Sequence, residues 1–308
     1  MSSKIMGLPQ KIDRSRIHRM YEGIEYKDFW SEDKRKHTLD LLEHTLVGSL
    51  IPTSGHRIVD LGCGFGRLSD CYLDRFEQVV MVDGSMTLLQ QAQETTQGRA
   101  TYIAADANHL PFRPSSFDCV LLFRVFHHIP NSQAIMSEVN RILGLKGIFV
   151  FNYCNKLSPR QIVRWILRLR HDNPFNFSPA GVGTRFISHH PRHVYKLLKQ
   201  NGYSNFHRLG SVIVDKIPDP FGILLPFAQW LAPVSGFANT ASWISYSVKK
   251  PSGEAIDKSC AVEKIFICPS CHGDLIHRPG AYTCKSCAST YPIKNGIIDF
   301  RLDSNEDF

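Results

Sequence analysis

The spacing of hydrophobic and polar positions changes near residue 57. Residues 10–50 show a helical pattern, with an apolar side that includes Leu39, Leu42 and Leu46. Five short apolar runs then alternate with segments long enough for helices, at residues 58–61, 79–82, 101–104, 119–123 and 148–151. Short runs rich in Val, Ile and Phe are typical of strands buried on both faces of a parallel sheet. The alternation predicts a doubly wound α/β domain.

A basic helix is expected directly after the fifth run. Ser158 and Pro159 fit its first positions, and Arg160, Arg164 and Arg168 lie four residues apart on one face. This helix either covers the core or lies on an anionic membrane or over a substrate mouth. Further elements are expected downstream: a helix over residues 191–202 and strands near 205–209 and 243–248.

Composition shifts divide the chain into three expected parts. With 308 residues, 43% of them hydrophobic, the chain can bury one large core and add a small accessory unit. The sequence KKPSG at residues 249–253 resembles a linker before that unit. We expect an N-terminal helical cap over residues 1–50, a main domain over 51–250 with a basic insertion or lid at 156–210, and a C-terminal module over 262–308.

The formal charge of +8 is concentrated in one segment. Residues 156–210 contain ten Lys or Arg and a single acidic residue, Asp172. One interpretation is an anionic partner such as nucleic acid, a phosphorylated substrate or lipid headgroups. The other is a solvated helix face, and the sequence leaves both open.

No segment predicts export or a membrane span. The polar, basic start lacks the apolar stretch of a secretory signal. The apolar run over residues 221–243 is interrupted by Pro226, Gln229, Pro233 and Asn239. It is therefore expected to form a buried helix and loop, because a span needs about 20 mostly apolar residues. The cytoplasm is the expected compartment.

A glycine-rich turn is the strongest local signal. The stretch IVDLGCGFGRLS places Gly62, Gly64 and Gly66 between a buried strand and an expected helix. Glycines let a backbone bend sharply and approach a ligand closely. A dinucleotide fingerprint would need its third glycine at the position of Arg67. The acidic Asp60 suits a ligand that carries an ammonium group better than a pyrophosphate.

Carboxylates follow three successive strands. Asp60 lies in the first, Asp83 ends the second, where it could bind a ribose diol, and Asp106 follows the third, where it could read an adenine amino group. The carboxyl ends of parallel strands meet at the crevice where such sheets bind ligands. Singly, each is more simply explained as a strand-end or N-cap residue; together with the glycine turn they indicate a nucleoside site.

These motifs resemble the class I S-adenosylmethionine-dependent methyltransferases, and the type 11 group most. The resemblance covers about residues 55–155 and rests on VDLGCGFGRLS, VVMVDGS, AADANHLPF, FDCVLLFRVFHHIPN and LKGIFVFNY. It implies a seven-stranded, mostly parallel Rossmann-like sheet whose last strand is antiparallel. It also implies a cofactor site made of Asp60, Gly62, Cys63, Gly64, Gly66, Asp83, Gly84, Met86, Asp106, Ala107, Phe123 and Arg124. Tyr21 or Tyr26 is a further candidate to cap the cofactor.

Methyl transfer itself requires little of the protein beyond in-line placement of the acceptor and exclusion of water. A general base is needed only if the acceptor must lose a proton. His128 and His127, after the fourth strand, are the candidates, with Tyr153 weaker. Each histidine has a simpler explanation as a core or cleft-lining residue.

Four of the nine cysteines form a compact metal motif near the C-terminus. Cys268 with Cys271 and Cys284 with Cys287 make two CxxC pairs separated by twelve residues. Such pairs present four thiolates to a structural zinc ion, which leaves no open position for catalysis. Iron is the minor alternative. Residues 262–308 resemble the small zinc-ribbon subunit that partners RNA and protein methyltransferases, here fused to one.

Three functions remain open from the sequence. The first is methylation of an O, N or C atom of a small molecule, favoured because no Pro-Pro-aromatic turn follows the fourth strand. The second is methylation of RNA, favoured by the ribbon and the basic segment. The third is a non-catalytic cofactor- or RNA-binding scaffold. An anionic membrane surface is a weaker candidate partner, and no stable protein partner is expected.

Overall fold

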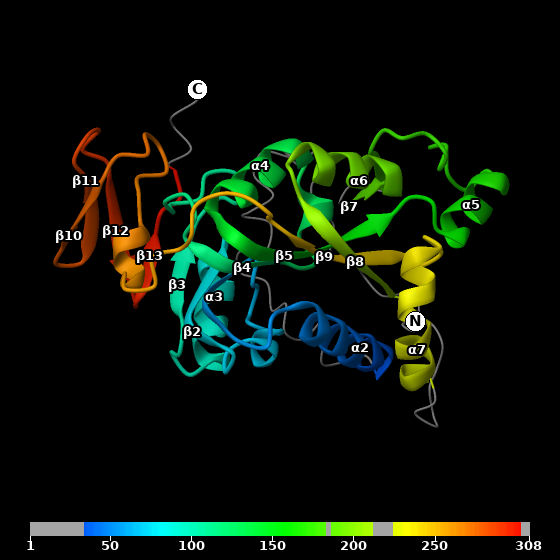
Figure 1. Ribbon diagram of the computed structural model, residues 1–308, viewed down its shortest axis with the longest axis horizontal. Helices are drawn as coiled ribbons and strands as arrows, with labels where there is room; N and C mark the ends of the chain where they lie inside the picture. Colours follow the sequence, from blue (N-terminus) through cyan, green and yellow to red (C-terminus); the bar gives the residue numbers. More distant parts are fainter. Residues whose placement is uncertain (1–33, 183–185, 212–223, 303–308) are drawn as a thin grey trace, which may run out of the picture.

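The computed structural model describes residues 34–182, 186–211 and 224–302 (Figure 1). All five predicted runs are strands: β1 Gly55–Leu61, β2 Phe76–Asp83, β3 Thr101–Ala104, β4 Phe117–Leu122 and β5 Leu143–Asn155. They pair in parallel in the order β3-β2-β1-β4-β5. The order reverses beside β1, so the ligand crevice of a doubly wound sheet lies at the carboxyl ends of these strands.

Further strands extend the sheet beyond β5. β9 Trp243–Lys249 runs antiparallel to β5, and β8 Ser204–Ser211 runs antiparallel to β9. The last residues of β5 also pair with β7 Phe186–His189, which pairs with β6 Ala180–Val182. Within the described ranges the paired sheet has thirteen strands. It is therefore larger than the seven strands implied by the resemblance.

Helices cover both faces of the sheet, as the α/β prediction requires. Buried side chains of α4 Ser132–Ile142 and α6 Pro191–Gln200 belong to the core on one face. Those of α2 Lys34–Leu50, α3 Met86–Thr95 and α7 Leu224–Phe237 belong to the core on the other. The remaining helices are α5 Pro159–Ile166 and the short 3-10 turns η2 Ser69–Cys71, η3 Phe126–His128 and η4 Val262–Ile265.

Two local predictions were wrong. The glycine turn is followed by η2 rather than a regular helix, since Gly64 and Gly66 have positive φ and Ser69 N donates to Gly66 O, a three-residue step. The run over residues 221–243 does contain α7, but this helix leaves large apolar side chains exposed instead of burying them. In the described ranges, no helix is long and apolar enough to cross a bilayer.

The C-terminal module is joined to the main sheet. It consists of β10 Leu275–Arg278, β11 Ala281–Cys284, β12 Thr290–Lys294 and β13 Ile297–Asp299. β13 pairs in parallel with β3, with Ile297 opposite Tyr102 and Asp299 opposite Ala104. The ring of Phe266 packs 6.1 Å from Phe112 of the main domain. The sheet therefore continues from the α/β core into the module, at the far end from α5 and α7 (Figure 1).

Candidate functional site

Strand register brings the predicted cofactor residues to one edge of the sheet. Leu61 of β1 lies opposite Val82, so Gly62 and Asp83 occupy the next positions of neighbouring strands. Asp83 lies opposite Ala104, two residues before Asp106. On the other side of β1, Asp60 lies opposite Leu121, two residues before Phe123. All four strands thus end at one edge of the sheet, where doubly wound sheets bind their ligands.

The glycine turn needs glycine for two separate reasons. Gly62, Gly64 and Gly66 have φ of +73°, +56° and +80°, a region that favours glycine. A Cβ on Gly62 would lie 2.3 Å from Cγ2 of Val125, so the turn packs directly against the chain after β4. A Cβ on Gly64 would meet no atom within 4 Å, so the structure leaves space on that side of the backbone. The turn fits a ligand that approaches the main chain.

Cys63 lies inside this turn but is not a reactive thiol. Its N–H donates to Val82 O at 3.1 Å, and its side chain is buried. Burial, with smaller contributions from Asp83 and Asp60, raises the pKa of the Cys63 thiol well above its usual value. A thiol held neutral is a poor nucleophile, so Cys63 contributes shape and backbone.

Asp60 is buried beneath the turn and held by a tyrosine. The hydroxyl of Tyr72, which is also buried, donates to Oδ2 of Asp60 at 2.7 Å. Burial raises the pKa of Asp60 to about 7, a shift opposed by the Tyr72 hydrogen bond. The carboxyl therefore changes charge near neutral pH, and a cationic group in the crevice would favour its ionised form.

Asp83 organises the crevice through the backbone. Its Oδ2 accepts from Gly64 N at 3.0 Å and its Oδ1 accepts from Ser85 N at 2.9 Å. Ser85 then caps α3, because its Oγ accepts from Leu88 N. Met86 is the first residue of that helix. One carboxylate thus fixes both the glycine turn and the helix start that carries Met86.

The C-terminal module reaches this same edge. Arg301 donates from Nη1 to the carbonyl of Gly84 at 3.2 Å and pairs with Asp299 at 2.8 Å. Phe300 N donates to Ala104 O at 2.8 Å, extending the pairing of β13 with β3. Residues that follow β13 therefore support the loop after Asp83.

Asp106 and Ala107 lie in the loop after β3. Oδ1 of Asp106 accepts from the backbone N–H of Asn108 at 2.8 Å and from its side-chain amide at 2.9 Å. Ala107 is partly buried against the core. These bonds give the loop a fixed shape, so Asp106 behaves as a turn-forming residue at the predicted adenine side.

Arg124 belongs to a buried ion network that sequence reasoning missed. Glu43 of α2 is fully buried and pairs with Arg124 and, at 2.7 Å, with Nη2 of Arg67. Burial disfavours the Glu43 carboxylate, but the two arginines prevail and leave its pKa below the ordinary value. The Arg124 guanidinium also stacks 4.0 Å above the ring of Trp243. The network links α2, the glycine turn, the end of β4 and β9.

Phe123 and Asn152 complete this side of the crevice. Phe123 is buried at the end of β4 and packs in the core that includes α2. Oδ1 of Asn152, on β5, accepts from Arg124 N at 2.7 Å, which supports the positive φ of Arg124. Nδ2 of Asn152 is buried with no partner among the described residues. A buried amide donor without a partner is a candidate ligand contact.

His127 and His128 form an aromatic group after β4. Their rings lie 4.0 Å apart, and Phe186 of β7 lies 4.8 Å from His127 and 5.4 Å from His128. His127 is buried, and burial, then His128 and Arg124, lower its pKa well below the usual value. His127 is therefore neutral at pH 7. His128 is only partly buried, which leaves it the better placed of the two to meet an acceptor.

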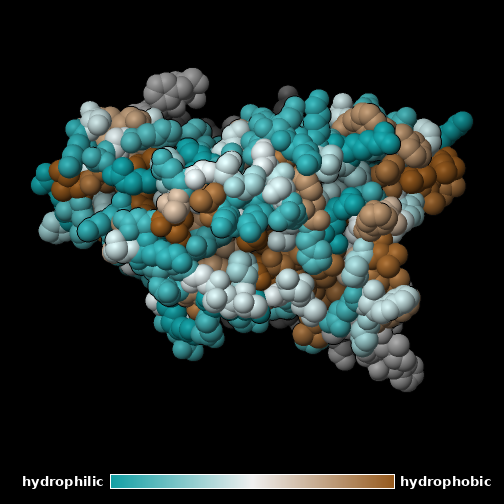
Figure 2. Space-filling model, viewed as in Figure 1, coloured by the Kyte–Doolittle hydropathy of each residue, from teal (hydrophilic) through white to brown (hydrophobic). Residues whose placement is uncertain are grey.

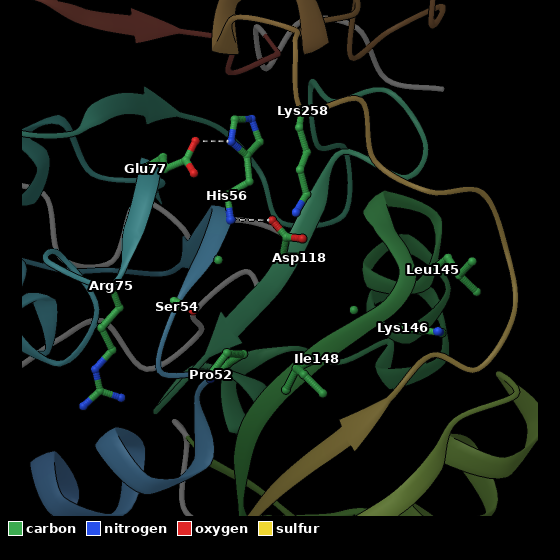
Figure 3. A pocket seen from close by; sticks show the side chains of 12 residues that line it. Pro52, Ser54, His56, Arg75, Glu77, Asp118, Leu145, Lys146, Ile148 and Lys258 are labelled. Carbon is green, nitrogen blue, oxygen red and sulfur yellow. Dashed lines mark hydrogen bonds and ion pairs between the residues drawn. The ribbon is translucent and has the colours of Figure 1, made fainter.

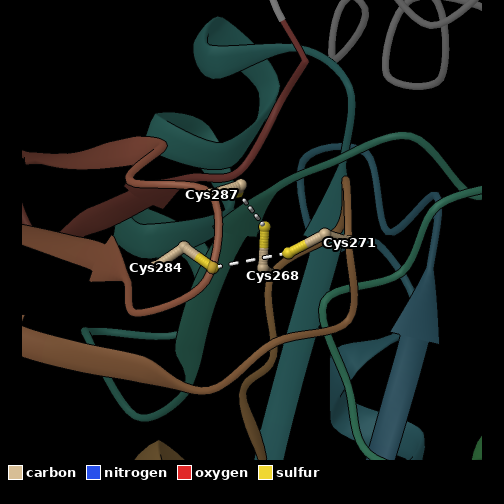
Figure 4. A group of neighbouring side chains, drawn as sticks. All are labelled: Cys268, Cys271, Cys284 and Cys287. Atoms are coloured by element: carbon tan, nitrogen blue, oxygen red, sulfur yellow. Dashed lines mark hydrogen bonds between the residues drawn. The ribbon is translucent and has the colours of Figure 1, made fainter.

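The four cysteines of the module come together as a group that could hold a metal ion (Figure 4). Their sulfur atoms all lie within 4.8 Å of one another, with Cys268 and Cys287 at 3.6 Å and Cys271 and Cys284 at 3.5 Å. Four sulfurs about 2.3 Å from one zinc ion would lie about 3.8 Å apart at tetrahedral angles. The spacing therefore fits a tetrahedral ion of this size.

Residues 59–151 match a family model described as a methyltransferase domain, Methyltransf_11. The matched stretch starts inside β1 and ends inside β5, so it contains the glycine turn and all three strand-end carboxylates. These residues are similar to a methyltransferase domain, and they make up less than half of the chain. The coarse part of the predicted resemblance is thereby confirmed.

Related chains extend beyond this domain to different degrees. An uncharacterized protein of Methanocaldococcus jannaschii is 27% identical over 254 residues, which cover 76% of this chain and 93% of that protein. The demethylmenaquinone methyltransferase of Thermobifida fusca is 26% identical over 143 residues, 42% of this chain and 61% of that enzyme. The chain thus spans less than two thirds of this curated methyltransferase.

Solved structures share the fold at low sequence identity. The [4+2]-cyclase SpnF has a TM-score of 0.56 at 17% identity, covering 80% of this chain and 100% of that one. Magnesium protoporphyrin IX methyltransferase from Synechocystis, with bound SAH, has a TM-score of 0.52 at 14% identity, covering 78% and 100%. A chain from the complex of the Haloferax volcanii Trm112 methyltransferase activator with a methyltransferase gives 0.50 at 18% identity, covering 73% and 97%.

The comparisons support S-adenosylmethionine-dependent methyl transfer and leave the acceptor undetermined. At these identities the structural neighbours show the methyltransferase fold alone, and one of them is named as a cyclase. The domain match carries the reaction class. Tyr21 and Tyr26, the suggested caps, lie outside the described residues.

Several residues that support the candidate site were not found from the sequence. Glu43 gave one usable signal, an acidic residue on the apolar side of a helix. Tyr72 and Trp243 gave none, because their roles depend on contacts between distant segments. Arg301 was missed because the pairing of β13 with β3 joins strands nearly two hundred residues apart.

A cavity of about 500 Å³ lies at the amino ends of the strands, opposite the carboxyl ends that carry the candidate cofactor site (Figure 3). His56, Glu77 and Asp118 line it near the starts of β1, β2 and β4. Nδ1 of His56 lies 2.7 Å from Oε2 of Glu77, and the backbone N–H of His56 donates to Asp118. Because doubly wound sheets bind ligands at their carboxyl edge, this cavity is separate from the candidate cofactor site.

Proposed function

We propose that this chain transfers the methyl group of S-adenosylmethionine to an O, N or C nucleophile of a small-molecule acceptor. The observation that carries the proposal is the meeting of the glycine turn, Asp83 and Asp106 at the carboxyl ends of β1–β3, inside the matched methyltransferase domain. The resemblance to quinone-pathway methyltransferases in part of the chain supports a small acceptor.

The residues present fit the cofactor. The turn from Gly62 to Gly66 would hold the methionine part near Asp60, Asp83 would bind the ribose hydroxyls, and Met86 would pack against the adenine beside Asp106 and Ala107. The space beside Gly64 and the Asn152 amide nitrogen, which has no partner among the described residues, support this placement. When bound, the cofactor supplies an electrophilic methyl group on a sulfonium.

The remaining side chains would orient the acceptor and exclude water. Phe123, Arg124 and the two histidines lie after β4, at the same edge as the glycine turn. His128 would accept a proton at a ring nitrogen if the acceptor must lose one. His127 is held neutral by burial and would serve as a wall and as support for His128.

The four cysteines are proposed to hold a structural zinc ion in a ribbon fused to the enzyme. Four thiolates at tetrahedral spacing match the ligand set that zinc prefers. The contacts of β13 with β3 and of Arg301 with Gly84 support a role in stabilising the cofactor edge. With all four positions taken by protein, the ion has no place for substrate.

RNA is the second candidate acceptor. The ten basic residues of segment 156–210 favour it, as does the resemblance of residues 262–308 to the small zinc-ribbon subunit that partners RNA and protein methyltransferases. A scaffold that binds the cofactor without turnover is the third. Incubation with methyl-labelled cofactor and fractionated cell extract separates them. Label in small molecules supports the proposal, label in RNA supports the second, and cofactor binding without label in any fraction supports the scaffold.

Cofactor binding tests the site directly. We expect Asp83→Ala to raise the calorimetric Kd for S-adenosylmethionine by about a hundredfold or more, because two charge-assisted hydrogen bonds are lost. Asp74→Ala is the matched control, since Asp74 is largely exposed in the same domain. A folded Asp83→Ala variant with unchanged affinity would place the ribose elsewhere.

A further inference from the structure

Exposed apolar side chains gather on α5 and the turn that follows it. The eight residues of α5, all of them described, include none that is buried. Val163 and Ile166 are 51% and 65% exposed, and Leu167 and Leu169 continue the surface at 61% and 65%. A helix this short is marginal in water without packing. Its apolar side chains therefore have too little cover within the described chain.

Helix α7 buries its small residues and exposes its large apolar residues, the reverse of the usual arrangement. Small residues face the protein: Ala228, Ala232 and Ser235 are buried. Large apolar residues at helical spacing face outward: Phe227, Trp230, Val234 and Phe237 are 53–76% exposed. Figures 1 and 2 place this helix and α5 at the same end of the molecule, where brown surface gathers. Large apolar side chains gathered on one end of a molecule in this way mark an interaction site.

The charge beside this surface favours an anionic partner. Arg160, Arg164 and Arg168 are exposed on α5 and its turn, interleaved with the apolar residues. Segment 156–210 holds ten Lys or Arg against one acidic residue. Basic residues next to highly exposed aliphatic and aromatic side chains are typical of helices that lie in the headgroup region of anionic lipids.

Other partners fit less well. RNA phosphates would meet the arginines but leave Ile166, Leu169 and Phe237 without apolar contacts. A second copy in a symmetric dimer would set one basic face against another, which repels. An anionic leaflet satisfies both the charge and the apolar surface.

A chain of contacts also connects α5 to the histidine pair of the candidate site. Arg170 donates to Ser188 of β7 at 3.1 Å and to Gln161 of α5 at 2.8 Å. Two residues before Ser188, Phe186 is 39% exposed and contacts the rings of both His127 and His128. The apolar end of the molecule thus leads to the histidine pair at the acceptor side.

We propose that the end of the molecule formed by α5, its following turn and α7 docks on the surface of an anionic lipid bilayer. The arginines contact headgroup phosphates, and the apolar side chains enter the boundary between headgroups and acyl chains. The proposal concerns binding alone and stands whether or not methyl transfer occurs.

Vesicle co-sedimentation of the full chain tests this surface. Vesicles of phosphatidylcholine are compared with vesicles in which about one third of the lipid is phosphatidylglycerol. We expect binding to the anionic vesicles and little to phosphatidylcholine alone. Replacing Arg160, Arg164 and Arg168 together by Gln should weaken binding about a hundredfold. Replacing Ile166 and Leu169 by Ser should weaken it about tenfold or more.

Matched controls lie on the ribbon at the other end. Ile276→Ser and Arg278→Gln change an exposed apolar and an exposed basic residue of β10, and should leave vesicle binding unchanged. Thermal melting checks that every variant is folded.

Four results would overturn the proposal. They are no binding of the wild type to anionic vesicles, equal binding by folded surface variants, loss of a wild-type dimer on changing Ile166 and Leu169, or binding of RNA in place of vesicles.

Discussion

The two lateral edges of the sheet are covered in different ways. We call the edge beside the C-terminal module the closed edge, and the edge beside α5 and α7 the open edge. At the closed edge, β3 pairs with β13, and Phe266 and Phe300 are buried between the module and the main domain. At the opposite edge, Ile166 and Trp230 remain more than half exposed. Among the described residues, the chain covers one edge itself and leaves large apolar side chains exposed at the other. Stability should depend on the first edge and binding on the second.

Loss of the proposed zinc ion should have the largest effect on the difference in stability between the two edges. In Cys268→Ser one of four thiolates is missing, and small zinc modules derive about 10 kcal/mol or more from their ion. We expect loss of bound zinc by elemental analysis and rapid hydrogen exchange over β10–β13. Cys260→Ser is the control, because this thiol lies outside the cluster. A Cys268→Ser protein with full zinc and a protected ribbon would contradict the assignment.

Removal of an aromatic ring at the closed edge should come next. Phe266 is buried and contacts Phe112, Tyr282 and Phe300. Phe266→Ala should reduce the free energy of unfolding by about 3–5 kcal/mol, measured in urea. Ile276→Ala, at an exposed position of the same module, should cost much less. Equal losses would mean that the module and the domain are not packed as one unit.

Acid should act on the open edge through a buried histidine. Burial, with a smaller contribution from His193, lowers the pKa of His189 on β7 to about 3. Because the unfolded chain titrates near 6.5, the stability that neutral His189 provides is present above that pH. It falls as the pH drops toward the folded pKa, by about 2 kcal/mol at pH 5.

The substitution His189→Leu should remove this contribution to the pH dependence of the free energy of unfolding. Urea unfolding at pH 7.5 and pH 5 should show the variant losing about 2 kcal/mol less than the wild type. His37→Leu, on α2, serves as the control for an exposed histidine. Parallel pH profiles for wild type and His189→Leu would exclude the histidine as the cause.

The smallest effect is expected on the open surface itself. Ile166→Ser should change the free energy of unfolding by less than about 0.5 kcal/mol, since the side chain is 65% exposed. The measurement is again urea unfolding, without lipid. A loss as large as that of Phe266→Ala would show that α5 is packed in the native protein, which would remove the contrast between the edges.

The sequence predicted the part of the fold that depends on local pattern. Each of the five parallel strands contains a short apolar run, and the turn of Gly62, Gly64 and Gly66 can be recognised directly in the sequence. The pairing of β13 with β3 was not predictable in this way, because a three-residue strand carries no period. The exposure of α7 was missed for a related reason: hydropathy shows that a helix is apolar, and not which face of it is covered.

Within the candidate site, residue types were easier to predict than their partners. Asp83 was expected at the crevice, where it binds Gly64 N and Ser85 N. That Glu43 would bridge Arg67 and Arg124 requires knowing how α2 crosses the sheet. Ion pairs of this kind depend on tertiary packing and leave no motif.

The pairing of β13 with β3 has a consequence for biosynthesis. Translation produces β3 long before Ile297–Asp299, so a growing chain carries β3 as an open strand edge for most of its synthesis. Exposed strand edges are templates for aggregation. Nascent chains would therefore need chaperones to shield β3 until β13 has been synthesised.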